Sequence, residues 1–183
     1  MINHGVQLVS GNCVLRPTTE GDMSRILELW NSDNVVGSMF VSKVDESDYL
    51  RFFEKYKTDP HEWRWTIESH SGAFVGTIRV YEKSAQFYIS QFALWPTKDF
   101  LAVAPIIIVN NFIFFNLQSD AIHMELARHN KRIKKLHGLL GAEYSGESIP
   151  HTACNGSIVI LEHWTYKRSI WCQNITFINS LLS

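Results

Sequence analysis

Strand-spaced and helix-spaced apolar patterns succeed one another along the chain, and their order predicts a mixed α/β fold. A strand is expected at 7–16, a helix from Thr18 or Thr19 to about Trp30, and a loop at 31–44. A second helix should follow Asp45, an N-cap residue, and end before Pro60. The remaining expected elements are strands at 63–69, 73–82 and 86–95, a helix within 101–117, a strand at 122–127, a helix from 131, and strands near 143–147 and 157–166.

The segment 122–142 carries the clearest of these patterns. Ile122, Met124 and Leu126 alternate with polar residues, which is typical of a half-buried strand. Asn130 can cap the helix that follows, because its side-chain oxygen can accept from free backbone N–H groups. The expected apolar face of this helix consists of Ile133, Leu136, Leu139 and Leu140. Gly141 should end the helix, since glycine tolerates a positive φ.

The run 101–117 is almost entirely apolar, but Pro105 and several asparagines interrupt it. It is short for a membrane span and has no flanking cluster of lysine or arginine. A helix that is hydrophobic almost all round is typical of a protein core, and Pro105 suits its first turn. We therefore expect a buried helix and no membrane span.

The bulk properties narrow the class of protein. A chain of 183 residues with 45% hydrophobic and 19% charged residues predicts one globular domain, 1–183. The net charge of −1 gives no field for nucleic acid. Three scattered cysteines and an amino terminus without a secretory pattern favour the cytoplasm. No histidine or cysteine spacing predicts a metal site.

The chain resembles the GNAT acetyltransferases in its order of elements and in the eleven-residue interval from Asn130 to Gly141. The resemblance implies an α/β (α+β) mixed sheet, mostly antiparallel and splayed in the middle, with helices on both faces. It also implies an acetyl-CoA-dependent N-acetyltransferase that acts on a small-molecule primary amine. The strings Leu-Arg-Pro at 15–17 and Asn-Ser-Asp-Asn-Val at 31–35 are similar to two branches, and Asn-Ser-Asp-Asn-Val-Val at 31–36, Met-Phe at 39–40 and Tyr-Leu-Arg-Phe-Phe at 49–53 favour the first of them. One acts on nucleotide-linked amino sugars of bacterial surface glycans, which we favour, and the other acts on ribosomal-protein N-termini.

The resemblance also implies where acetyl-CoA would bind. The strand end at Phe92, Ala93, Leu94 and Trp95 would expose main-chain groups to the pantetheine arm. The pyrophosphate would meet the loop and helix start at Lys98, Asp99, Phe100, Leu101, Ala102 and Val103. Asn130 and Lys134 complete the expected set. Phe100 stands where the family usually has glycine, whereas Ala102 fits the last position of the motif.

Two residues are candidates for the chemistry. His137 occupies the position of the tyrosine that, in the family, protonates the CoA thiolate, and imidazole titrates near neutrality. Glu125 lies on a strand from which a carboxylate can act through water. Tyr88 and Ser90 could line the acceptor pocket. Phe40, Trp63 and Trp65, together with Tyr88, could also offer flat surfaces to a ring, although for the tryptophans core packing is the more ordinary role.

Two other interpretations stay open at this point. A GNAT-fold protein without efficient transfer, acting as a CoA-binding or partner subunit, is favoured by Phe100 and by His137 in place of tyrosine. An unrelated α/β domain would lack the splayed sheet. The family resemblance is also compatible with a homodimer.

Overall fold

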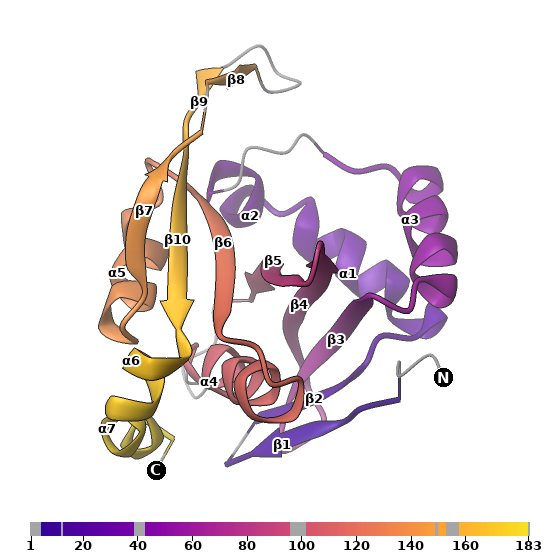
Figure 1. Ribbon diagram of the computed structural model, residues 1–183. Coiled ribbons are helices and arrows are strands. Elements are labelled where there is room, and N and C mark those ends of the chain that lie inside the picture. Colours follow the sequence, from indigo (N-terminus) through magenta and orange to yellow (C-terminus); the bar gives the residue numbers. More distant parts are fainter. Residues whose placement is uncertain are drawn as a thin grey trace.

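The computed structural model describes residues 5–11, 13–38, 43–95, 102–148, 150–152 and 158–182. An eight-stranded sheet runs through this part of the chain in the order β1-β2-β3-β4-β5-β6-β10-β7 (Figure 1). Its strands are β1 (Leu8–Ser10), β2 (Cys13–Pro17), β3 (Glu62–Ser69), β4 (Phe74–Lys83), β5 (Gln86–Leu94), β6 (Ala121–Ala127), β7 (Glu143–Glu147) and β10 (Leu161–Lys167). All neighbours are antiparallel except β5 and β6, which are parallel. A short pair, β8 (His151–Thr152) and β9 (Ile158–Val159), projects from one end.

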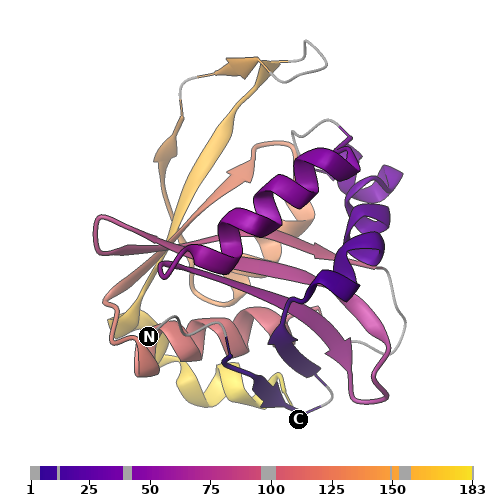
Figure 2. The same cartoon turned by 90° about the vertical axis from the view of Figure 1, so that its right-hand side faces the viewer.

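Helices cover both faces of the sheet. One face carries the 3-10 turn η1 (Glu20–Asp22) and the helices α1 (Met23–Trp30), α2 (Asp33–Ser38) and α3 (Glu46–Thr58), and Figure 2 shows α3 crossing in front of the strands. The other carries α4 (Ala104–Asn111), which continues into the π-helical turn η2 (Phe112–Asn116), and α5 (Lys131–Leu139), α6 (Arg168–Gln173) and α7 (Ile175–Ser180). The mixed, mostly antiparallel sheet with helices on both faces was the expected fold class.

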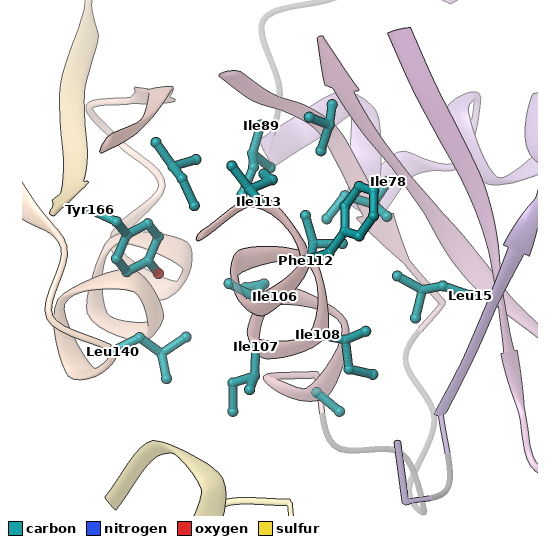
Figure 3. Packing of buried hydrophobic residues seen from close by; sticks show 14 of the residues in the cluster. Leu15, Ile78, Ile89, Ile106, Ile107, Ile108, Phe112, Ile113, Leu140 and Tyr166 are labelled. Carbon is teal, nitrogen blue, oxygen red and sulfur yellow. The ribbon is translucent and has the colours of Figure 1, made fainter. Parts of the chain in front are cut away.

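The main core lies between the sheet and α4. Ile106, Ile107 and Ile113 are fully buried, and Figure 3 shows this helix between the strand residues and the side chain of Tyr166. A helix enclosed in this way needs apolar residues all round, as the run at 101–117 predicted. No helix in the described part of the chain is long and apolar enough to cross a membrane.

Two predicted helix ends are confirmed by their backbone geometry. The Asp45 carboxylate accepts from the backbone N–H of Asp48 at 2.8 Å and caps α3. At the end of α5, Gly141 has φ +86°, and the Ala142 N–H donates to the carbonyl of His137 at 3.0 Å. These local signals hold because each cap satisfies backbone groups that the helix itself leaves unpaired.

The structure corrects three predicted elements. The strand at 7–16 is a hairpin of β1 and β2, because Gly11 turns the backbone at φ +56°. The loop at 31–44 contains helix α2. The strand at 157–166 divides into β9 and β10, since the carbonyl of Ile160 accepts from Arg128 instead of pairing within the β8–β9 sheet.

The apolar face predicted for α5 is also partly wrong. Leu139 is 56% exposed, whereas His137 is 2% exposed and faces the core. The segment after β10, which sequence patterns do not place, forms α6 and α7. These helices return to the core through Trp171 and Ile178, and the Trp171 indole N–H donates to the Asn111 side chain at 2.8 Å. The face of α5 that is buried therefore depends on the elements packed against it, and α6 is one of these elements.

Candidate active site

The sheet opens between β5 and β6. Their parallel pairing covers only three residue pairs and stops where Ile89 lies opposite Met124. Beyond this point a bulge bends β5, because Gln91 has φ +50° and the pairing with β4 shifts register there. The rest of β5, from Ser90 to Leu94, pairs with β4 but not with β6. A bulge therefore produces the splayed middle that the sequence interpretation expected.

A cavity of about 80 Å³ occupies this opening. Its lining comes from β5, β6 and the start of α5: Ile89, Ser90, Gln91, Phe92, Met124, Glu125, Leu126, Ala127, Asn130, Ile133 and His137. Ser90 and Glu125 alternate along their strands with Ile89 and Met124, so both faces of the sheet contribute to the lining. A molecule in this cavity can thus be approached from either side of the sheet.

The amino-terminal end of α5 faces this cavity. The Asn130 side-chain oxygen accepts from the Ile133 N–H at 3.2 Å, which confirms the predicted cap. Lys134, one turn further on, does not point a free ammonium at the opening: its Nζ lies 2.9 Å from a carboxylate oxygen of Glu162. Its predicted contact with the cofactor stays a prediction, and would have to compete with this ion pair.

His137 of α5 lines the cavity and is 2% exposed. Its Nδ1 is 2.8 Å from the hydroxyl of Tyr166 on β10, and the two rings meet edge to face. Burial lowers the pKa of His137 to about 4, because an imidazolium would lose its hydration there. At neutral pH the side chain is therefore uncharged. The prediction that His137 titrates near neutrality is therefore corrected, because this environment does not preserve the ordinary imidazole pKa.

Glu125, the other catalytic candidate, is half exposed at the opposite face of the opening. A carboxylate oxygen lies 3.5 Å from Nδ1 of His163, its neighbour on β10. Among the described residues that line the cavity it is the one carboxylate. The structure thus brings His137 and Glu125 to the same opening but on different faces of the sheet, and their roles stay predictions.

The predicted pantetheine positions divide into two groups. Phe92 and Leu94 are partly buried against the main core. Ala93 is buried in a small cluster with Leu29, and the Trp95 side chain packs against this cluster. The backbone N–H of Trp95 donates to the Val75 carbonyl at 2.8 Å. The side chains of Ala93, Leu94 and Trp95 serve as packing, whereas Phe92 also lines the cavity. Contact of the other three residues with the cofactor would come from the main chain of the unpaired strand edge.

The predicted pyrophosphate loop is described only at its end. Lys98, Asp99, Phe100 and Leu101 lie outside the described residues, as does Phe40. Ala102 and Val103 form the turn that leads into α4, and the Val103 carbonyl accepts from Ile107 at 3.1 Å. Pro105 occupies the first turn of the helix as expected.

The face of the sheet on the Glu125 side carries a row of three polar rings, of which the first two are stacked and the third is tilted. Tyr88 on β5 lies between Tyr81 on β4, with centroids 5.0 Å apart and planes 8° from parallel, and His123 on β6, at 5.3 Å. The Arg79 guanidinium covers the far side of Tyr81 at 4.7 Å. Both ring faces of Tyr88 are therefore occupied, and its hydroxyl donates to the Gln86 side chain at 2.9 Å.

This arrangement corrects the expectation that aromatic faces receive a ring of the acceptor. Trp63 and Trp65 are buried in the core, and the faces of Tyr88 are covered. Arg79 donates to Glu62 at 2.6 Å. Burial alone would raise the pKa of the Glu62 carboxyl, but Arg79 and Arg64 hold it below its usual value. Within the described residues no three histidine, cysteine or acidic side chains gather in a way that suits a metal ion.

Comparison with solved structures supports this architecture. No protein-family model matches the chain, and no curated protein matches it either. Among solved structures, an apo FdhC, described as a nucleotide-linked sugar GNAT, is 20% identical, with a TM-score of 0.78 over 98% of this chain and 99% of its own. A GCN5-related N-acetyltransferase from Brucella melitensis is 11% identical, with a TM-score of 0.82 over 100% of this chain and 88% of its own.

The chain has the GNAT fold. A third GNAT structure, spermidine N-acetyltransferase from Vibrio cholerae in complex with CoA and spermine, is 18% identical, with a TM-score of 0.78 over 88% of this chain and 98% of its own. The interpretation as an unrelated α/β domain is therefore wrong. Sequence reasoning had found this GNAT fold but missed Gln91 and Tyr166. A bulge at a non-glycine residue has no sequence signature, and Tyr166 is 29 positions from the histidine that it contacts.

Proposed function

We propose that this protein is an acetyl-CoA-dependent N-acetyltransferase that transfers the acetyl group to a primary amine. The observation that carries the proposal is the opening between β5 and β6, with its cavity and the capped start of α5 beside it. The backbone of β5 beyond Ile89 has donors and acceptors that β6 does not pair. An amide-containing chain such as pantetheine suits that edge, because it can complete the missing hydrogen bonds.

The two faces of the opening divide the work in this proposal. The thioester lies on the α5 side, where Asn130 and His137 line the cavity. The amine approaches from the face that bears Ser90 and Glu125. Holding the two reactants on opposite sides of one narrow opening supplies the positioning on which acyl transfer depends. Glu125 is half exposed, so it can take the proton of the incoming ammonium through a water molecule and release it to solvent.

For the acceptor we propose an amino sugar linked to a nucleotide. The row of Tyr81, Tyr88 and His123 presents polar edges, which suit the hydroxyl groups of a sugar. A polyamine would instead require several carboxylates without partners. On this face Glu62 is bound by two arginines, and Glu125 lies beside His163. A nucleotide-linked sugar GNAT shares this fold over 98% of the chain.

A test is release of CoA thiol when the purified protein meets acetyl-CoA and a panel of nucleotide-linked amino sugars, free amino sugars, polyamines and peptides. We expect turnover with the nucleotide-linked sugars and a large loss in Glu125→Gln. The matched control is Glu143→Gln, an exposed glutamate on β7 that is paired with Lys167 away from the opening. Acetylation of peptides alone would transfer the proposal to the N-terminal acetyltransferase branch. CoA binding without thiol release from any amine would favour a GNAT-fold binding protein.

A further inference from the structure

The hydrogen bond between Tyr166 and His137 restricts where the imidazole proton can lie. Both side chains are buried, and the Tyr166 oxygen is 2.8 Å from Nδ1 of His137. A buried hydroxyl must donate its proton to an acceptor. Asn110 of α4 also lies close to this hydroxyl, and its effect is to lower the pKa of Tyr166, as a donated N–H does and an accepting oxygen does not. Among the described residues, Nδ1 of His137 is therefore the acceptor of the Tyr166 hydroxyl proton.

This donor direction determines the tautomer of the histidine. If Nδ1 accepts from Tyr166, the proton of a neutral imidazole must sit on Nε2. Burial raises the pKa of the Tyr166 hydroxyl and lowers that of His137, so the phenol keeps its proton and the imidazole stays neutral. His137 also lines the cavity. Because Nδ1 is engaged by Tyr166, Nε2 is the ring nitrogen that can bind a ligand in the cavity.

We propose that Tyr166 is a positioning residue that holds His137 as a neutral Nε2–H donor directed at the thioester sulfur in the opening. The inference rests on the proposed acetyl transfer. In the reaction the amine nitrogen adds to the carbonyl carbon, the C–N bond forms, and the C–S bond breaks with its electron pair on sulfur. Nε2–H donates a hydrogen bond to the departing thiolate and keeps its own proton. The acetylated amine nitrogen loses its proton to solvent, and the CoA thiolate takes a proton from solvent.

A neutral donor and a titrating acid differ in their consequences. An acid must be recharged in every cycle, which a histidine with a pKa near 4 cannot do at neutral pH. A neutral N–H acts as a fixed dipole and needs no recharging. Within the described part of the chain, the charged group that shares the cavity lining is Glu125, and it lies towards the opposite face of the sheet. The pH profile of kcat should therefore show no titration near pH 6.5 that disappears when His137 is replaced.

The decisive measurement is the nitrogen-15 NMR spectrum of the histidine-labelled protein, which distinguishes the two tautomers without any turnover. We expect His137 to be neutral and protonated on Nε2 from pH 6 to 8, and its Nε2–H resonance to move when CoA is added. Tyr166→Phe should mix the tautomers. Tyr144→Phe, a change at an exposed tyrosine of β7, should not. An Nδ1–H tautomer, or titration between pH 6 and 7, would overturn the proposal.

Two substitutions at His137 separate donor from acid in the activity. A glutamine amide can place an N–H near the position of Nε2 but cannot titrate. We expect His137→Gln to retain at least about tenfold more kcat than His137→Leu, with similar KM for acetyl-CoA. Tyr166→Phe should lower kcat more than it raises KM. Equal loss in the glutamine and leucine variants would refute the donor role.

Calorimetry of the wild-type protein with CoA distinguishes failure of this inference from failure of the proposed function. Binding of CoA with an unchanged Nε2–H resonance would overturn the role of His137 and leave the acetyltransferase proposal standing. Absence of CoA binding would overturn both.

Discussion

Gly76 of β4 is the position at which a single added carbon should disturb the opening most directly. It pairs with Leu94 across the strand, and a Cβ at this position would lie 2.2 Å from the Ala93 carbonyl oxygen and 2.7 Å from Cδ2 of Leu94. The oxygen belongs to the backbone, so no rotamer change can relieve the contact. Gly76→Ala must therefore push the end of β5 away from β4 by roughly 1 Å, given ordinary carbon–oxygen packing distances.

The magnitude follows from overpacking a buried site. Forced insertion of a methyl group into a packed interior costs about 1–3 kcal/mol, and a clash with rigid backbone belongs in the upper part of that range. For a chain of this size each kcal/mol lowers Tm by about 2–4 °C, so we expect a fall of roughly 4–12 °C. Because the displaced segment is the strand edge proposed to bind pantetheine, affinity for CoA should fall as well.

The measurement is thermal unfolding followed by circular dichroism, together with calorimetric titration with CoA below the unfolding transition. Gly138→Ala is the matched control, since its Cβ would meet nothing closer than Trp164 at 4.0 Å. That change should be neutral or stabilising, because alanine favours a helix by about 1 kcal/mol over glycine. A Gly76→Ala protein with unchanged Tm and unchanged CoA affinity would refute the geometry of the opening.

Three further predictions concern other parts of the molecule. Ala102→Glu should abolish CoA binding in a protein that remains folded, because a carboxylate at the turn before α4 would repel the pyrophosphate; unchanged affinity by calorimetry would contradict the assignment. Asn130→Ala should cost about 1 kcal/mol of stability in urea unfolding and also lower kcat/KM, whereas Asn130→Ser keeps a capping oxygen and should restore the stability; if it also restored full turnover, Asn130 would be only a cap. The pKa of Asp22 is lowered from 3.8 to about 2, because burial, which raises it, is outweighed by hydrogen bonds from Arg16 and Thr19. The carboxylate therefore stabilises the fold above pH 4, and this contribution is lost as the pH falls towards 2. Asp22→Asn should therefore flatten the loss of Tm between pH 4 and pH 2, and an unchanged slope would show that the ion pair does not contribute.

Local signals in the sequence were sufficient for most helix and strand positions. The caps at Asp45 and Asn130, the positive φ of Gly141 and the all-apolar α4 each follow from groups within a few residues of one another. The order of these elements, together with the interval from Asn130 to Gly141, carried the resemblance to the GNAT fold. Two local errors also have local causes. Gly11 breaks the first strand into a hairpin, and a short helix stands where small and polar residues suggested a loop.

Tertiary structure alone decided the character of the site. The bulge places Gln91, a non-glycine residue, at a positive φ that its side chain does not favour. The pairing of β5 with β4 and with the short end of β6 holds this conformation in place. The sequence suggested that His137 is an ionisable acid. Enclosure against Tyr166 makes it neutral, because the energy of a charge depends on the solvent and dipoles around it, and these come from α4, β10 and α5 together. The sequence by itself determined which segments form helices and strands, because those interactions are local. The folded chain decided which of their side chains meet at the opening and in which protonation state.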